Sequence, residues 1–335
     1  MIKCSLGCRA ECEQFYFQGE DVMIRKILTS CFFLTSMVLA TDSISTDKNI
    51  EWQTYLTDGA VITFIPVNKT LWYATSSTVG KITLKTQKKS EIKDLGGIPP
   101  IGVNDMDVDS KNVVWFATQN GVAYGSTSFN SFPSGDKIPE GEVNTILVTA
   151  EDEVWIGTNN GAARYINGNW SIVTEEEGLI GNKVVDIIQD SKKVLWFATN
   201  KGISTLKDGQ WSSHTKSSGN GLSFNKINAL AFDDKRMKIW ASAGAADACM
   251  YDGEKWKCFM DVQSNTTCIM VDTQSRVWFG APDGLVKYNG FEWVYDQSAL
   301  NVPAQLAHCL LRDSDGDLWF ATNSGVVHVK NPYPF

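Results

Sequence analysis

The chain has 335 residues, of which 43% are hydrophobic and 20% are charged. This is the composition of a globular protein that can bury a large core. Its 30 basic and 38 acidic residues give a formal net charge of −8, and no basic block interrupts the sequence. The charge balance therefore argues against a nucleic-acid partner. Two counts stand out, because the chain has twelve tryptophans and only three histidines.

The N-terminal segment predicts export. Residues 27–40 form the one long apolar run, and Arg25 and Lys26 precede it. A run of this length is too short to cross a hydrocarbon core of about 30 Å, but it fits the apolar region of a signal peptide that ends at Ala40. An uncleaved N-terminal anchor is the alternative to a cleaved signal.

Met23 is a better start than Met1, because the residues that follow it form a positively charged n-region. We therefore expect residues 1–40 to be a leader, made of a mis-assigned start and a signal peptide. Residues 41–335 are expected to form one domain. Such a protein would be periplasmic or secreted, without a stable membrane span after the signal is cleaved.

A repeat of about forty residues organises the rest of the chain. Seven tryptophans, each preceded by an aliphatic residue, recur at spacings of 38 to 44 residues. They are Trp72, Trp115, Trp155, Trp196, Trp240, Trp278 and Trp319. Self-similarity at this period is typical of β-propellers and related repeat folds.

The repeat around Trp196 contains four short β-runs, expected at 183–189, 194–198, 203–206 and 210–214. Turn residues separate these runs, and no segment shows sustained helical periodicity. A glycine follows the second run in five repeats, where a hairpin turn requires a positive φ. These glycines are Gly121, Gly161, Gly202, Gly284 and Gly325. Four strands in each repeat of this length predict one blade of a β-propeller.

The strand count indicates how the ring closes. Seven first, second and third strands follow residue 60, but only six fourth strands do. The missing strand is expected at residues 51–55, which match residues 292–295. We therefore predict an all-β fold, a seven-bladed β-propeller with four-stranded blades, in which the N-terminal strand completes the last blade. Closure removes the exposed sheet edge that would otherwise favour aggregation.

The tryptophans fit this architecture. Seven occupy the second strand of a blade, and the other five, Trp52, Trp170, Trp211, Trp256 and Trp293, occupy the fourth strand. We expect all twelve to pack between strands and blades, where large aromatic side chains dominate burial, rather than to form a carbohydrate-stacking surface.

Two motifs resemble a known repeat family. The unit LWFATN-x-G and the preceding GL-x-x-N-x-[VI], seen at 178–184 and 221–227, resemble the two-component regulator propeller repeat, and the resemblance covers residues 50–335. It implies a ligand-sensing propeller of the kind found in the periplasmic regions of hybrid histidine kinases and in free-standing exported proteins. The sequence shows no kinase or DNA-binding segment, so any signal output is expected to need a second protein.

Polar residues recur where the first strand of each blade begins, at the mouth of the central channel. Counting back ten or eleven residues from the second-strand tryptophan, with one insertion in the fifth repeat, gives Asn104, Asp105, Asn144, Asp186, Asn228 and His308. Because binding pockets use a few convergent polar groups, this ring predicts a ligand-binding site. A polar lining that only holds water is an equally good interpretation.

A hairpin at residues 249–258 is a candidate for a disulfide. With a loop at 252–255, Cys249 lies opposite Cys258 on the neighbouring strand, at a distance that a disulfide can bridge. Two free, buried thiols are the alternative.

Alternating carboxylates at Asp313, Asp315 and Asp317 resemble a Ca²⁺ loop. The pattern is not repeated in the other blades, and an Asp-rich turn between the first and second strands is the commoner explanation. Ca²⁺ is therefore only a weak cofactor candidate.

The sequence favours a binding protein over an enzyme. The three histidines lie in different repeats without metal-ligand spacing, and there is no nucleophile elbow or phosphate-binding loop. The expected partner is a small molecule, a glycan or another exported protein. One alternative is a channel-mouth enzyme, a lyase or glycoside hydrolase, that uses Asp105, Asp186 and His308. Virginiamycin B lyases share the predicted architecture, but that family relies on a His-centred metal site. A protein-interaction scaffold is the other alternative.

Overall fold

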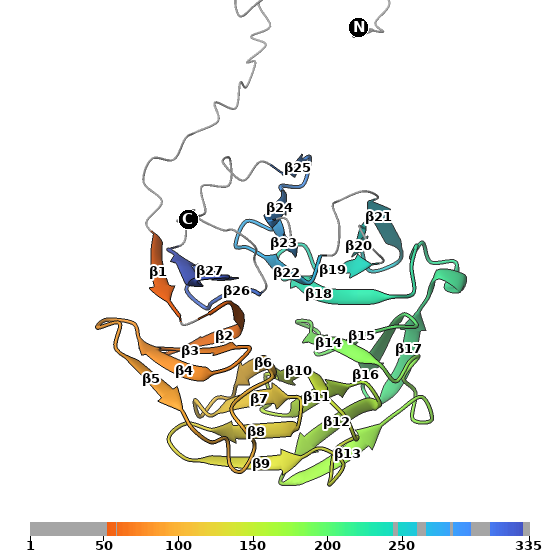
Figure 1. The fold of residues 1–335 in the computed structure, drawn as a ribbon. Helices are drawn as coiled ribbons and strands as arrows, with labels where there is room; N and C mark the ends of the chain where they lie inside the picture. Colours follow the sequence, from red (N-terminus) through yellow and green to blue (C-terminus); the bar gives the residue numbers. More distant parts are fainter. Residues whose placement is uncertain are drawn as a thin grey trace, which may run out of the picture. The chain divides into compact units, whose positions relative to one another are not determined.

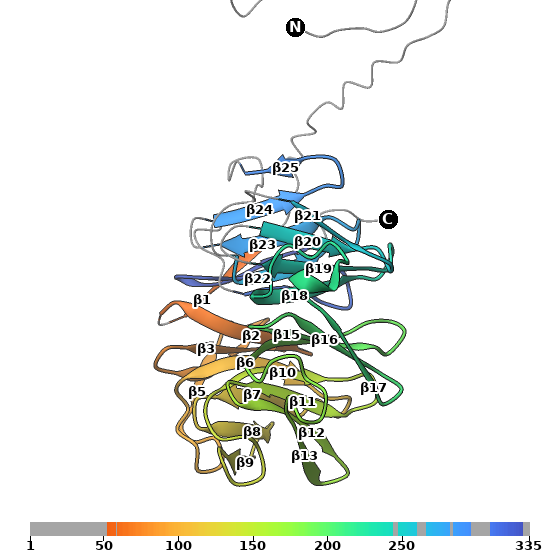
Figure 2. The same ribbon diagram turned by 90° about the vertical axis from the view of Figure 1, so that its right-hand side faces the viewer.

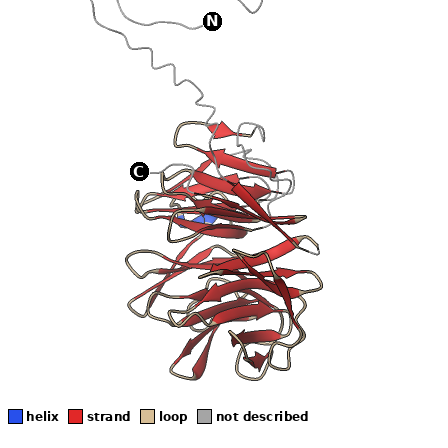
Figure 3. Cartoon of the chain, turned by 90° about the vertical axis from the view of Figure 1, so that its left-hand side faces the viewer, coloured by secondary structure: helices blue, strands red, loops and turns tan. Residues whose placement is uncertain are grey.

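The structure, a computed structural model, describes residues 52–57, 59–243, 247–259, 266–281, 284–295 and 309–330. Within these ranges the chain forms 28 strands and one short 3-10 helix, η1 (Lys216–Ser218), so the fold is all-β (Figure 3). The predicted leader and His308 lie outside the described residues. Nowhere in the described ranges does a helix have the length and apolarity needed to cross a membrane.

The strands pair in chain order into seven antiparallel sheets of four strands, the blades. Blades 1 and 2 comprise β2 (Val61–Val67), β3 (Thr70–Thr75), β4 (Val79–Thr83) and β5 (Lys89–Ile92), then β6 (Val103–Val108), β7 (Val114–Thr118), β8 (Gly121–Gly125) and β9 (Phe129–Pro133). Blades 3 and 4 comprise β10 (Val143–Val148), β11 (Val154–Thr158), β12 (Gly161–Ile166) and β13 (Asn169–Val173), then β14 (Val184–Gln189), β15 (Leu195–Thr199), β16 (Ile203–Lys207) and β17 (Gln210–His214).

Blades 5 and 6 comprise β18 (Ile227–Asp233), β19 (Lys238–Ala243), β20 (Asp247–Tyr251) and β21 (Trp256–Phe259), then β22 (Cys268–Val271), β23 (Val277–Ala281), β24 (Gly284–Tyr288) and β25 (Trp293–Val294). Blade 7 comprises β26 (Leu310–Arg312), β27 (Leu318–Thr322), β28 (Gly325–Val329) and β1 (Trp52–Leu56). The four strands expected around Trp196 agree with β14 to β17 within two residues at each end. The five predicted hairpin glycines all have positive φ, between 126° and 151°.

The blades form a ring around the first strand of each. The inner strands β2, β6, β10, β14, β18, β22 and β26 contact one another in this order, and blade 7 contacts β2 again. Figure 1 shows these strands gathered at the centre, with the fourth strands outermost. The view turned by 90° shows β2, β6 and β10 as neighbours again (Figure 2). The predicted seven-bladed propeller is confirmed.

The N-terminal strand closes the ring as predicted. β1 pairs with β28 along its whole length, from Trp52 opposite Val329 to Leu56 opposite Gly325. Tyr55 of β1 is buried and stacks on Trp319 with the ring centroids 6.0 Å apart. A strand from one end of the chain therefore completes the core of the blade formed by the other end.

The second-strand tryptophans are buried between blades, as expected from the sequence. All seven are at most 6% exposed. In several pairs of blades the indole packs on a second-strand phenylalanine of the next blade. The pairs are Trp72–Phe116 (5.8 Å), Trp155–Phe197 (5.3 Å), Trp240–Phe279 (6.2 Å) and Trp278–Phe320 (5.9 Å between centroids). These contacts join each blade to the next.

An aspartate in the turn between the first two strands fixes the tryptophan of the same blade. In blade 4, Asp190 Oδ1 accepts hydrogen bonds from the backbone amides of Lys192 and Val194, and Oδ2 accepts one from Trp196 Nε1 at 3.1 Å. Blades 2, 6 and 7 repeat the arrangement with Asp109–Trp115, Asp272–Trp278 and Asp313–Trp319. One carboxylate thus closes a turn and satisfies a buried indole N–H.

Blade 3 keeps the turn but lacks the carboxylate. Thr149 occupies the aspartate position, and its hydroxyl accepts the amides of Glu151 and Glu153. One hydroxyl oxygen cannot also reach the indole, and Trp155 Nε1 is buried without a hydrogen-bond partner among the described residues. An unpaired buried donor of this kind reduces the free energy of unfolding.

The GL-x-x-N motif organises the loop that enters a blade. In blade 4, a Cβ on Gly178 would lie 2.4 Å from the Trp211 ring, so only glycine permits this approach. The next residue, Leu179, is 3% exposed in the blade core. Asn182 Oδ1 accepts a hydrogen bond from the Glu175 amide at 2.8 Å and ties the loop base together. Each of these three motif residues is therefore required by a packing contact or a hydrogen bond in the loop.

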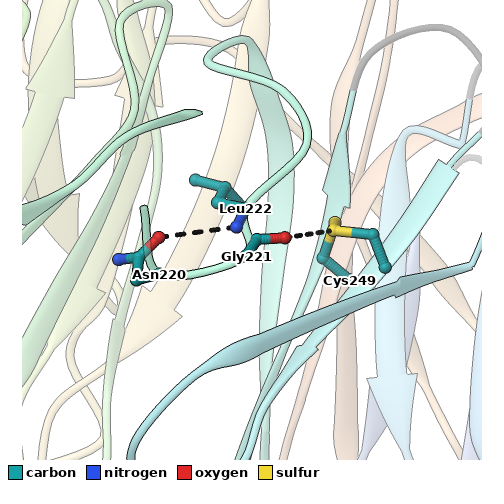
Figure 4. Close-up of a disulfide and its surroundings, with 5 residues drawn as sticks. Asn220, Gly221, Leu222 and Cys249 are labelled. Carbon is teal, nitrogen blue, oxygen red and sulfur yellow. Dashed lines mark hydrogen bonds between the residues drawn. A yellow bond between two sulfur atoms is a disulfide. The ribbon is translucent and has the colours of Figure 1, made fainter. Parts of the chain in front are cut away.

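The second copy of the motif lies on a disulfide in blade 5. The structure joins Cys249 of β20 and Cys258 of β21, which are directly opposite in the sheet, with a Cα–Cα distance of 4.0 Å. Cys258 Sγ lies 3.6 Å from the Gly221 carbonyl oxygen (Figure 4). A Cβ on Gly221 would lie 2.2 Å from the Trp256 carbonyl oxygen. The entry loop and the disulfide hairpin are thus closely packed.

Replacing Thr149 by aspartate should stabilise the protein. The second carboxylate oxygen would accept the Trp155 indole N–H, as in blades 2, 4, 6 and 7, and add about 1 kcal/mol to the free energy of unfolding. Thermal denaturation would show this as a rise of a few degrees. Thr149→Asn is the matched control, because its one acceptor oxygen serves only the turn amides. Equal melting temperatures for the two variants would contradict the interpretation.

Removing the disulfide should destabilise blade 5. Because the cross-link closes a short loop, we expect Cys249→Ser combined with Cys258→Ser to lower the free energy of unfolding by about 2–3 kcal/mol, measured by guanidinium denaturation. Reductant should shift the wild-type midpoint towards that of the double variant. Peptide mapping without reduction should recover the linked 249–258 pair. Coincident wild-type and variant midpoints would argue against the cross-link.

Candidate functional site at the channel mouth

A β-bulge starts the inner strand in five blades. In β6 the register shifts between Val103 and Asp105, and β2, β10, β14 and β18 show the same shift. The extra residue bends a strand and re-aims the side chains beside it. Two consecutive side chains per strand therefore reach the channel mouth, as the pairs Ile62/Thr63, Asn104/Asp105, Asn144/Thr145, Val185/Asp186 and Asn228/Ala229.

These pairs line a hollow of about 260 Å³, together with Cys268 and Cys309 from blades 6 and 7. Five of the six residues predicted for the channel mouth lie in this lining, and the sixth, His308, is outside the described residues. Counting back from the second-strand tryptophans located these residues at the channel mouth but did not predict the bulge.

The asparagines of the ring connect neighbouring blades. Asn104 Nδ2 donates to the Val143 carbonyl and to Glu142 Oε1, both at 2.9 Å. Asn144 Nδ2 donates to the Val184 carbonyl at 2.8 Å. Each amide thus reaches from the start of one inner strand to the start of the next.

The aspartates make the complementary contact. Asp105 Oδ2 accepts hydrogen bonds from the Thr145 hydroxyl and the Ile146 amide, both at 3.0 Å. Asp186 Oδ2 accepts one from the Leu230 amide at 2.7 Å. The inner strand is a sheet edge, and its amides have no neighbouring strand to bond. The carboxylate of one blade therefore supplies the acceptor that the next blade lacks.

Asp107 makes the same contact, and the sequence analysis missed it. Its Oδ2 accepts a hydrogen bond from the Val148 amide, and its Oδ1 accepts one from Val108, both at 2.7 Å. Residues two apart share one face of a strand, so the carboxylate at 107 follows Asp105 along the same face. That period-2 relation could have indicated it.

Burial changes the acidity of these carboxyls. It raises the pKa of Asp105 to about 6 and the pKa values of Asp107 and Asp186 to about 7. Backbone amides oppose the rise, whereas the charge of Asp105 adds to it at the other two. A carboxyl with such a pKa exchanges its proton near neutral pH. The oxygens of these three carboxyls accept hydrogen bonds from the next blade. Protonation or deprotonation of the carboxyls therefore changes the free energy of unfolding.

The two cysteines of the lining are poor nucleophiles. Burial raises the pKa of Cys268 to about 12 and the pKa of Cys309 well above its ordinary value. Nearby carboxylates contribute in the same direction. The reactive form of a cysteine is the thiolate, so both thiols are unreactive near neutral pH.

A second hollow of about 510 Å³ adjoins the channel mouth and shares Val185, Asn228 and Thr267 with it. Lys183, Asn200, Lys226 and Thr266 complete its polar lining. The lysines directly precede the inner strands of blades 4 and 5, at equivalent positions of the GL-x-x-N-x-[VI] motif, but the sequence analysis did not single them out. The second hollow offers two ammonium groups, carboxamides and hydroxyls, which suit an anionic or hydroxyl-bearing ligand, whereas Asp105 and Asp186 line the channel mouth.

The acidic turn of blade 7 is a turn of the same type as in blades 2, 4 and 6. Asp313 Oδ1 accepts the amides of Asp315 and Asp317, and its Oδ2 accepts Trp319 Nε1. The side chains that come together are Asp313, Asp317 and His328, with ligand atoms within 4.8 Å of one another, and Asp315 is not among them. Ca²⁺ prefers an all-oxygen environment, which this group does not supply.

The family model of the two component regulator propeller matches residues 178–201 and 301–324. Both matches cover the same part of the repeat, from the GL-x-x-N region of blade 4, or its counterpart in blade 7, to the second strand. Two segments of the chain thus match the repeat of this family. No curated protein sequence matches it.

Solved structures share the fold. The extracellular domain assigned to a hybrid two component system of B. thetaiotaomicron aligns with a TM-score of 0.69 over 84% of this chain and 41% of that domain, at 20% identity. Virginiamycin B lyase from Staphylococcus aureus aligns at 0.65 over 84% and 98%, with 15% identity. YCF48 bound to a D1 peptide aligns at 0.64 over 84% and 96%, also with 15% identity. The chain spans about two fifths of the two component domain.

The free energy of unfolding should fall as the pH rises from 5.5 to 8. The folded pKa of Asp107 lies above the ordinary value of 3.8, so the folded state binds this proton more tightly. Its contribution is full below about pH 4 and is lost as the pH rises through 7, a change on the order of 1–2 kcal/mol over the window.

Asp107→Asn removes this contribution together with its coupling to Asp105, whereas groups away from this pair, including His214, titrate equally in both proteins. Denaturation midpoints at pH 5.5 and 8 should converge in the variant relative to the wild type. An unchanged pH dependence in Asp107→Asn would show that this carboxyl stays ionised.

Proposed function

We propose that this chain, whose repeats match the two component regulator propeller, is an exported sensor-type propeller that binds a polar small molecule or glycan at the channel mouth. One observation carries the proposal. The 260 Å³ channel hollow and the 510 Å³ hollow beside it share Val185, Asn228 and Thr267, so the two hollows lie side by side. Sites of this kind recognise ligands through a few convergent polar groups.

The side chains support a ligand with an acidic group. Lys183 and Lys226 place two ammonium groups at the rim, while Asn200 and Asn228 add carboxamides. Carboxamides hydrogen-bond hydroxyl groups, and ammonium groups attract carboxylate or sulfate. An acidic oligosaccharide combines both features.

Two observations support a periplasmic or secreted location. The disulfide between Cys249 and Cys258 is of a kind that persists in oxidising compartments. The solved two component proteins of B. thetaiotaomicron that share this fold are extracellular domains. Signal output would then pass through a separate kinase-containing protein or a further part of a larger assembly.

The enzymatic alternative would use Asp105 and Asp186. Both have raised pKa values, as an acid catalyst requires, but their Oδ2 atoms accept hydrogen bonds from the next blade. Similarity to virginiamycin B lyase at 15% identity supports the shared fold and not its reaction. We therefore propose binding without turnover. A scaffold for protein partners is the remaining alternative.

Ligand-dependent thermal stabilisation tests the proposal. The full chain should melt several degrees higher with an acidic oligosaccharide at a hundredfold excess over its Kd, which corresponds to about 2.7 kcal/mol. Lys226→Ala should weaken the Kd about tenfold by removing one charged contact. Lys111→Ala, in an exposed turn of blade 2 on the opposite face, is the control and should leave the Kd unchanged.

A panel of acidic and neutral oligosaccharides and peptides that leaves the melting temperature unchanged would reject a small-molecule sensor. Product formation in the same mixtures would instead support the enzyme.

A further inference from the structure

The residue opposite each second-strand tryptophan covers the indole in six blades. On the neighbouring third strand the pairs are Trp72–Lys81, Trp115–Tyr124, Trp155–Arg164, Trp196–Thr205, Trp240–Met250, Trp278–Lys287 and Trp319–His328. All partners are large except Thr205 of blade 4.

Three of these partners are permanent cations that lie against the ring. Lys81 Nζ is 3.7 Å from the Trp72 centroid, and Lys287 Nζ is 5.2 Å from that of Trp278. The guanidinium carbon of Arg164 is 5.8 Å from the Trp155 centroid. In blade 7 the imidazole of His328 stacks on Trp319 at 3.9 Å. The ring quadrupole attracts a cation at such distances.

Blade 4 has a hollow where these side chains would lie. Its volume is about 730 Å³, and it opens between blades 4 and 5. Trp196, Thr205, Ser212, His214 and Tyr251 are part of its lining. Ser212 lies opposite Thr205 on β17, so two small hydroxyl side chains in succession leave the space open.

Three aromatic rings from two blades pack against one another and form part of the wall of this space. His214 stacks near Trp196 at 5.5 Å, and Tyr251 of blade 5 approaches Trp196 at 5.6 Å and His214 at 5.0 Å. Burial lowers the pKa of His214. Asn220 Nδ2 lies 2.9 Å from His214 Nδ1, which fits a neutral ring that accepts this hydrogen bond. His214 therefore does not supply the missing cation itself.

The polar side of the hollow offers acceptors. Asp190 and Asp208 supply carboxylates, and Thr205, Gln210 and Ser212 supply hydroxyl and amide oxygens. Two exposed lysines, Lys192 and Lys207, also belong to the lining. The combination of aromatic faces with carboxylates is the chemistry that recognises an organic cation.

We infer that the hollow between blades 4 and 5 is a binding site for an alkylammonium or guanidinium group, which lies beside Thr205 at the position that Lys81, Arg164 and Lys287 occupy in their blades. The cation belongs to a free amine or to a lysine or arginine side chain of a partner peptide. This site is separate from the channel mouth, so it does not depend on the proposed function.

Calorimetric titration of the full chain tests the inference with three probes. The first is N-acetyl-lysine amide, the second is the same compound with an acetylated ε-amine, and the third is a Gly/Ser peptide with one central lysine. The charged probes should bind saturably, and ε-acetylation should weaken binding at least about tenfold by removing the charge. If the peptide binds and N-acetyl-lysine amide does not, the cation comes from a partner protein. If both bind equally, the cation comes from a small amine.

Thr205→Lys provides the decisive variant, because it should fill the hollow from within. We expect it to abolish binding of the charged probes and to raise the melting temperature. Thr205→Val, of nearly the same volume, should bind within about twofold of wild type. Tyr251→Leu should weaken binding by removing one aromatic face. Lys111→Ala, in the exposed turn of blade 2, should have no effect.

Three results would overturn the inference. They are equal binding of the acetylated probe, wild-type binding by a folded Thr205→Lys variant, and no saturable binding of any cation.

Discussion

A four-stranded blade has no second sheet of its own, so its apolar faces are buried only where the next blade packs on it. The second-strand tryptophan is central to this contact, and Trp155, Trp240 and Trp319 are among the largest fully buried side chains. Such an arrangement is stable only when every blade has two neighbours. Pairing of β1 with β28 meets that requirement, because Tyr55 covers Trp319 at the point where the two ends of the chain meet.

The same geometry leaves backbone polar groups of the inner strands without strand partners at the centre of the ring. Seven inner strands turn an unpaired edge towards the channel, and buried amides without acceptors are costly. Asp105, Asp107 and Asp186 accept amide hydrogen bonds from the following blade, and Asn104 and Asn144 donate to its carbonyls. The polar ring at the channel mouth is therefore first a structural device. Ligand recognition there depends more on the surrounding loop residues, among them Lys183 and Lys226.

Departures from the repeat identify the positions where the molecule does something different. Thr149 replaces a turn aspartate and leaves the Trp155 indole nitrogen without a partner. Thr205 replaces a long strand residue and leaves a hollow above Trp196. Both substitutions put a small hydroxyl residue beside a tryptophan. The first reduces stability, whereas the second opens a space lined by aromatic rings, because it lies on the strand face and not in the turn.

The sequence by itself determined the seven blades, their strands and the closure by residues 51–55, because a period of about forty residues and alternating burial leave a clear pattern. It also located the Cys249–Cys258 pair and the channel positions, since register follows from counting along strands. Only the tertiary structure decided what those polar residues contact. Asp105 accepts a hydrogen bond from the Ile146 amide, and Thr205 leaves a hollow beside Trp196, through contacts between strands and blades. Such contacts depend on bulges, twist and the distance to the next blade, none of which a single chain's pattern records.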